Sequence, residues 1–154
     1  MAMALSACAV DSGGDSPAQR TSPSHWKESV RSGEVAEAMH VRIPPQAVQV
    51  KGAVRVNPQE DQYLLTFVTD EEQAERTAES LNAEDPLTGE RKGSASGALF
   101  EHLDLAAPES LDNVRWAGVC PPCVNDSSRS DLQWIEIYVE PMPHDKARVY
   151  LQAF

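Results

Sequence analysis

The sequence is short of positive charge, of aromatic residues and of long apolar runs. Its 154 residues hold 13 Lys and Arg against 24 Asp and Glu, a formal net charge of −11, and there are only three each of Phe, Trp and Tyr. Because so negative a chain repels a phosphate backbone, we expect no nucleic-acid partner. No apolar run approaches the ~18–20 residues that a transmembrane helix needs.

The motifs of common catalytic and cofactor sites are also missing. The chain has no GxSxG elbow, HExxH helix, Walker loop or GxGxxG turn, and no DxDxDG calcium loop. We therefore predict no enzyme activity, no cofactor and no resident metal. The composition that remains, with 41% hydrophobic and 24% charged residues, is that of a folded domain of ordinary size.

Residues 1–24 are predicted to be a truncated signal with a lipobox and a flexible tether, ahead of a single globular domain at 25–154. Leu5-Ser6-Ala7-Cys8 has the pattern of a bacterial lipobox, in which small residues precede a cysteine that receives a diacylglyceryl group. Only four residues precede the motif, so the signal peptide is truncated, and residues 9–24 have a tether's composition. We expect lipid on Cys8 to anchor the protein to the outer face of the cell membrane. The alternative is a frayed terminus that carries the motif by chance.

Two hairpins are predicted from the alternation of apolar and polar residues. Residues 48–56 alternate as in a half-buried strand, and after a polar turn at 57–61 residues 63–68 are apolar on both faces. The second of these strands should be the more central one, because both of its faces need cover. Residues 132–139 and 147–154, on either side of a break at Pro141 to Asp145, predict the second hairpin.

The main helix is predicted from Asp70 to about Asn82, between the hairpins. Thr69 and Glu72 have the spacing of a capping box at its start. Its inward side should consist of the small and apolar residues Ala74, Thr77, Ala78 and Leu81.

Weaker patterns predict helical segments within 26–39, a short helix at Pro108, a strand within 114–119 and a polar loop at 125–131. The order of these elements predicts an α+β fold. Its mainly antiparallel sheet of two hairpins would carry one main helix packed on a face.

Several of these features together resemble small actinobacterial surface lipoproteins of unknown function. The resemblance rests on the lipobox, the Ser/Gly/Pro tether, the Ile43-Pro44-Pro45 entry to the first hairpin, the YLLTFVTD strand, the late cysteine pair and the terminal RVYLQAF. It implies a secreted, lipid-anchored location. It implies no activity and no catalytic residue.

Cys120-Pro121-Pro122-Cys123 is the most specific motif of the domain. Outside the cell, such a pair predicts a local disulfide that stiffens one loop. Thiol–disulfide exchange is the alternative, although turn-forming residues follow the motif in place of the helix that usually stabilises a thiolate. A zinc site is a third reading, and it would need His102 and His144 to complete the ligands.

An aromatic group on the second hairpin is a possible binding patch. Trp134, Tyr138 and Tyr150 lie opposite the apolar side of that hairpin, beside Arg148. If their face is open, they can bind a partner. If Trp26 or the segment 99–116 covers them, they form a second small core, which is the reading that we favour.

The negative charge is concentrated in one region of the chain. Between Asn57 and Glu90, ten acidic residues stand against one Arg, a local charge of −9. The predicted helix presents an acidic face of Asp70, Glu71, Glu72, Glu75 and Glu79. Besides the membrane at Cys8, we expect an unknown protein or small-molecule partner, and a partner selected by charge would be basic.

Overall fold

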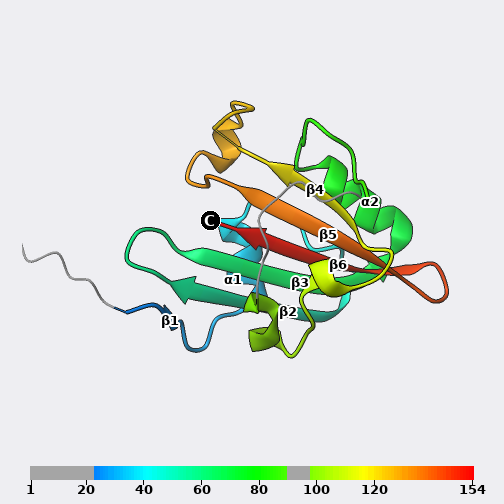
Figure 1. Ribbon diagram of the computed structural model, residues 1–154, viewed down its shortest axis with the longest axis horizontal. Helices are drawn as coiled ribbons and strands as arrows, with labels where there is room; N and C mark the ends of the chain where they lie inside the picture. Colours follow the sequence, from blue (N-terminus) through cyan, green and yellow to red (C-terminus); the bar gives the residue numbers. More distant parts are fainter. Residues whose placement is uncertain (1–22, 90–97) are drawn as a thin grey trace, which may run out of the picture.

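The computed structural model describes residues 23–89 and 98–154, which build one antiparallel sheet with helices on both of its faces (Figure 1). Cys8 and most of the predicted tether lie outside the described residues. In chain order the strands are β1 (His25–Trp26), β2 (Val48–Val56), β3 (Gln62–Asp70), β4 (Arg115–Val119), β5 (Ile135–Met142) and β6 (Lys146–Ala153). No helix in the described ranges is long and apolar enough to cross a membrane. The predicted α+β class is confirmed.

Both predicted hairpins are present, and they meet in the middle of the sheet. The strand order is β1-β2-β3-β6-β5-β4, with every neighbouring pair antiparallel. β3 lies between β2 and β6 and is buried along most of its length, as its apolar sequence predicts. The strand predicted within 114–119 is β4, which forms one edge of the sheet next to β5.

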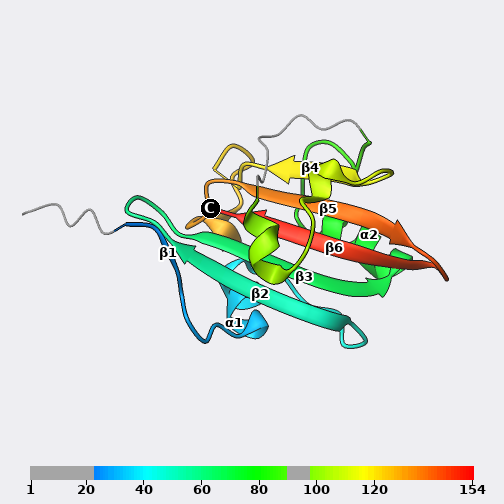
Figure 2. The ribbon, with the colours of Figure 1, turned by 60° about the horizontal axis from the view of Figure 1, so that its bottom comes forward.

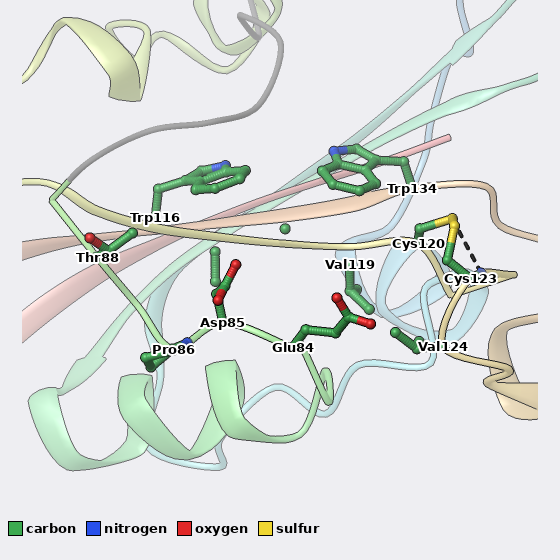
Figure 3. Close-up of a pocket in the computed structure, with 12 residues that line it drawn as sticks. Glu84, Asp85, Pro86, Thr88, Trp116, Val119, Cys120, Cys123, Val124 and Trp134 are labelled. Atoms are coloured by element: carbon green, nitrogen blue, oxygen red, sulfur yellow. Dashed lines mark hydrogen bonds between the residues drawn. A yellow bond between two sulfur atoms is a disulfide. The ribbon is translucent and has the colours of Figure 1, made fainter.

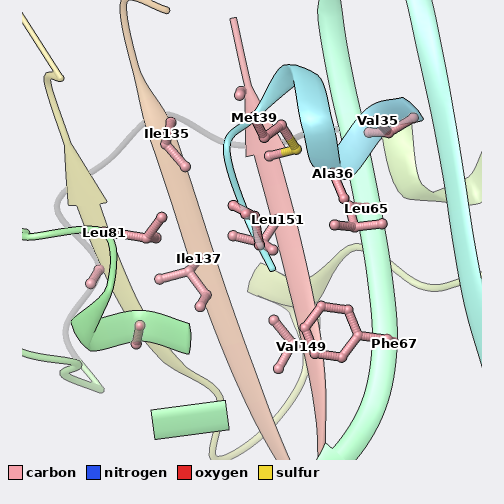
Figure 4. Close-up of a cluster of buried hydrophobic side chains, with 14 of the residues drawn as sticks. Val35, Ala36, Met39, Leu65, Phe67, Leu81, Ile135, Ile137, Val149 and Leu151 are labelled. Carbon is pink, nitrogen blue, oxygen red and sulfur yellow. The ribbon is translucent and has the colours of Figure 1, made fainter. Parts of the chain in front are cut away.

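Two helices cover one face of the sheet, α1 (Ser32–Ala38) and α2 (Glu71–Glu79) (Figure 2). Met39 and Val35 of the α1 region and Leu81 after α2 reach the apolar side chains of β3, β5 and β6 (Figure 4). All four residues predicted to face inward from the main helix are buried: Ala74, Thr77, Ala78 and Leu81. Residues 26–39 contain one helix, and Trp26 belongs to β1, where it pairs with Arg55 of β2.

α2 begins one residue later than the capping-box pattern predicts. β3 continues through Asp70, because Thr69 and Asp70 pair with Ala147 and Lys146 of β6. Thr69 is therefore a strand residue, and its buried hydroxyl makes no hydrogen bond within the described chain. Lys146 Nζ donates to the Asp70 carboxylate at 2.5 Å, which lowers the pKa of that carboxyl. The predicted capping box is wrong, because Thr69 pairs with β6 as a strand residue and does not cap the helix.

The opposite face of the sheet carries a second, smaller core. The 3₁₀ helix η1 (Leu99–Leu103) supplies much of its cover, and a second one, η2 (Pro108–Ser110), follows in the chain. Figure 2 shows η1 across the sheet from α1. Phe100 meets Tyr150 edge to face at a centroid distance of 5.3 Å. This cluster consists of Ala53, Leu64, Phe100, Leu103, Trp116, Tyr138 and Tyr150. The central strands are thus buried on both faces.

A buried arginine ties the ends of both helices to the loop before β5. Arg129, at the end of η3 (Ser127–Arg129), is only 5% exposed. Its guanidinium donates to the carbonyls of Met39 at 3.1 Å and His40 at 2.9 Å after α1, and to that of Ser80 at 3.4 Å after α2. Asp126 balances the charge at 2.9 Å. A cation suits the negative ends of two helices, so this predicted polar loop is a structural clamp.

Glycine at position 52 lets α1 approach the sheet. A Cβ at this point of β2 would lie 2.9 Å from the Ser32 backbone and 3.0 Å from the Val35 side chain. We expect Gly52→Ala to lower the free energy of unfolding by about 1–3 kcal/mol, because the helix must shift to admit the methyl group.

Chemical denaturation measures this change, and Gly33→Ala in α1 is the matched control. A Cβ at Gly33 meets nothing within 4 Å, so the control should keep its stability or gain up to about 1 kcal/mol. Equal stability of Gly52→Ala and the native chain would contradict the close packing of α1 on β2.

Candidate binding pocket

A pocket of ≈ 520 Å³ lies at the free edge of β4 (Figure 3). The loop that follows α2 forms one wall, β4 forms the floor, and the cysteine loop closes one end. Its lining combines two indoles, two carboxylates and the two cysteines: Glu84, Asp85, Pro86, Thr88, Trp116, Ala117, Gly118, Val119, Cys120, Cys123, Val124 and Trp134. This mixture of apolar surface and a few polar groups is typical of ligand pockets.

The pocket opens beside an isolated bridge between Thr88 and Trp116 of β4. The Thr88 N–H donates to the Trp116 carbonyl at 2.9 Å, and the Trp116 N–H donates to the Thr88 carbonyl at 2.7 Å. In an antiparallel ladder the next such pair would join Pro86 to Gly118. Proline has no N–H to donate, and the chain from Glu84 to Pro86 leaves the strand path.

Gly118 therefore presents its backbone to the pocket. Because N–H and C=O directions alternate along a strand, both groups of Gly118 point to the same side as those of Trp116, away from β5. Neither group makes a hydrogen bond among the described residues. A Cβ at this position would lie 2.5 Å from Trp134 and 2.7 Å from Trp116, so only glycine leaves room for both indoles above the strand.

Cys120 and Cys123 form a disulfide at the end of the pocket, with a bond of 2.07 Å. The predicted pairing is thus present. The Cys123 N–H donates to Cys120 Sγ at 3.3 Å, and a turn follows the pair in place of a helix. Since the two sulfurs are bonded to each other, neither is a thiolate that could hold a metal in this state.

The predicted acidic face of α2 is largely paired with cations. Lys146 bonds Asp70, Arg76 bonds Glu72, and Arg115 of β4 bonds Glu75 and lies 4.0 Å from Glu71. Glu79 is the member of the predicted face that has no ion pair among the described residues.

Two further carboxylates, which have no cation partner in the described part of the chain, lie at the pocket itself. Glu84 and Asp85 are exposed, and neither makes an ion pair within residues 23–89 and 98–154. They also line an adjoining hollow that reaches Glu79 on α2. Among the described residues, the carboxylates of this region that lack an ion pair therefore lie beside the pocket, further along the chain than the start of the predicted acidic face.

The predicted aromatic patch is not an open surface. Tyr138 and Tyr150 are 1% and 2% exposed, because the segment that contains η1 covers them. Arg148 donates to Gln49 at 2.7 Å and is mostly buried. The exposed-patch reading is wrong for the two tyrosines, and the alternative of a second small core is right. Only Trp134 of this group lines the pocket.

A buried carboxylate holds the pocket indole in place. The Trp134 N–H donates to Glu136 Oε1 at 2.9 Å, and the Tyr138 hydroxyl donates to Glu136 Oε2 at 2.6 Å. Nearby, the Tyr150 hydroxyl donates to Glu140 at 2.8 Å, and burial, more than this bond, raises the pKa of Tyr150. Tyr138 thus acts from within the core, by holding the Glu136 carboxylate that bonds Trp134.

The structure does not assemble the zinc ligands that the sequence offered. His102 stacks on Trp26 with ring centroids 3.9 Å apart, and His144 lies in the turn between β5 and β6. Within the described ranges, no group of three or more His, Cys, Asp or Glu side chains could hold a metal ion.

Comparisons with family models, with curated proteins and with solved structures find no match to this chain. Functional inference therefore rests on the pocket and on the sequence patterns.

Sequence reasoning missed most of the pocket. Trp116 and Gly118 come from one segment and the Glu84-Asp85-Pro86 turn from another, and the pairing of Thr88 with Trp116 brings the two together. A local signal did exist, because a glycine two residues after a tryptophan in an edge strand can mark a close approach. The partner of that glycine, however, depends on tertiary pairing.

Burial of Tyr138 makes a stability prediction. We expect Tyr138→Ala to lower the free energy of unfolding by about 3–5 kcal/mol, because it opens a cavity in the second core. Tyr138→Phe keeps the ring and removes only the hydroxyl that bonds Glu136, so it should cost about 1–3 kcal/mol. Denaturant melts of both variants measure the difference, and unchanged stability of Tyr138→Ala would restore the open-patch reading.

Proposed function

We propose that this chain is an extracytoplasmic lipoprotein, anchored through Cys8, whose globular domain is a binding module. The pocket beside β4 is the observation that carries the binding role. The lipobox pattern and the tether-like residues 9–24 support the location, and the Cys120–Cys123 disulfide is consistent with an oxidising compartment.

The chemistry of the pocket favours binding. Its indoles supply apolar area, its backbone edge supplies one donor and one acceptor, and its carboxylates supply charge. Trp134 is fixed through Glu136, so this wall is in place before a ligand arrives, which reduces the entropy lost on binding. A tether between lipid and domain would leave the pocket accessible to a partner at the cell surface.

Anchoring is tested by expressing the chain from its gene, with the upstream codons, and separating membranes from soluble fractions. We expect the native protein in the membrane fraction and labelled by an alkyne fatty acid. Cys8→Ala should be unlabelled and soluble, because it lacks the thiol that carries the lipid. Ser6→Ala, which keeps a small residue before the intact thiol, is the control. A soluble, unlabelled native protein would refute the anchor.

Thiol–disulfide exchange remains the second candidate, on the strength of one contact. The Cys123 N–H bond to Cys120 Sγ would stabilise a thiolate, and the disulfide lines a pocket. In such a reaction a substrate dithiol would be oxidised to a disulfide while Cys120 and Cys123 become thiols. Against this, Glu84 and Asp85, which line the same pocket and have no ion pair among the described residues, are negative and disfavour a thiolate.

Equilibration of the folded protein in glutathione buffers separates the two functions. A structural disulfide should have a potential below ~−300 mV and stay oxidised in these buffers. A potential in the range of exchange catalysts, between ~−270 and ~−120 mV, would instead support the redox function. Mass spectrometry after thiol alkylation reads the oxidised fraction.

A further inference from the structure

We propose that the gap beside β4 receives a short, extended, basic peptide, which pairs with Gly118 as an added strand. This inference rests on the proposed binding function and names the chemistry of the partner. Three observations on residues 23–89 and 98–154 carry it: a backbone position of β4 without a hydrogen-bond partner, a pocket alongside it, and two carboxylates without an ion pair at its wall.

The backbone edge fixes the conformation of the ligand. Gly118 offers one N–H and one C=O on the side where Trp116 pairs with Thr88. A peptide residue opposite Gly118 would repeat the Thr88–Trp116 arrangement, with its own N–H donating to the Gly118 carbonyl and its C=O accepting from the Gly118 N–H. Pro86 cannot make the first of these bonds, so the chain itself leaves the position open.

The two sides of β4 fix the order of side chains in the ligand. Figure 3 shows Trp116 and Trp134 on one side of the strand, and Glu84 and Asp85 on the other. Because side chains alternate along a strand, the residue opposite Gly118 faces the indoles, and the residue before it, opposite Val119, faces the carboxylates. The peptide must end at the residue opposite Gly118, because the Thr88–Trp116 pairing already places Leu87 and Thr88 opposite Ala117 and Trp116. The expected pattern is a basic residue followed by a C-terminal apolar residue.

Charge complementarity favours Lys or Arg immediately before the apolar residue. Glu84 and Asp85 lack a cation among the described residues, and Glu79 extends the negative surface along the adjoining hollow. The carboxylates of α2 nearer its start are already paired with Arg76, Arg115 and Lys146. A basic peptide would therefore meet the free charges of this surface at the pocket.

The test uses the full chain and the probe acetyl-Lys-Thr-Lys-Val-amide, in which the terminal Val lies opposite Gly118. Binding is followed by ¹⁵N–¹H NMR and calorimetry at low salt. We expect saturable binding that weakens as salt is added. The Gly118 amide should shift and become protected from hydrogen exchange. Replacing both Lys by Glu should abolish binding. N-methylation of the terminal Val removes the donor to the Gly118 carbonyl and should weaken binding by about tenfold or more.

Paired variants separate the pocket charges from net charge. The double variant Glu84→Gln with Asp85→Asn should bind the probe about tenfold more weakly than the native chain does. The control, Glu28→Gln with Glu37→Gln, changes two exposed acids that line none of the described pockets, and it should bind as the native chain does.

Three results would overturn the proposal: no binding at millimolar peptide, binding without any change at Gly118, or equal binding of the N-methylated probe. Each of these leaves the membrane fractionation of Cys8→Ala unaffected. Failure of the peptide site and failure of the lipid anchor are therefore distinguishable.

Discussion

Eight consecutive residue pairs, from Tyr63–Ala153 to Asp70–Lys146, join β3 to β6 in the middle of the sheet. These pairs join the first hairpin to the last one, which lies near the other end of the chain. Each of the two central strands therefore contributes side chains to both cores, one on each face of the sheet. Alternate residues of β6 show the consequence, since Leu151 packs under α1 and α2 while Tyr150 packs under η1. Pairing two strands that lie so far apart in the sequence closes a long loop and costs conformational entropy. Burial of apolar side chains on both faces of the sheet must offset that cost.

The same topology places β4 at the edge of the sheet, where the outward backbone N–H and C=O groups have no neighbouring strand to pair with. Thr88 covers one position of that edge, and Pro86 prevents the cover from continuing. The result is a strand edge that is accessible at Gly118 and flanked by a fixed indole, a disulfide and two carboxylates. The pocket thus exists because the outer edge of β4 is only partly covered. Its polar character comes from the backbone groups that this edge leaves exposed.

The sequence predicted those elements in which apolar residues recur at the regular spacing of a strand or a helix. Both hairpins, the inward side of α2 and the central place of β3 follow from alternation that tertiary contacts reinforce. The start of α2 did not follow, because pairing of Thr69 with Ala147 overrides a local capping signal. The role of Arg129 was also hidden, since its acceptors come from the ends of two helices far away in the sequence. The pocket belongs to this second group.

The central claim is that β4 has an open backbone position between paired neighbours. Amide hydrogen exchange of the free protein, followed by NMR, tests it residue by residue. Exchange should be slow at Trp116, which bonds Thr88, and at Ala117 and Val119, which face β5, and it should be fast at Gly118. Slow exchange at Gly118, at the rate of its neighbours, would mean that the edge is already covered and would contradict the account.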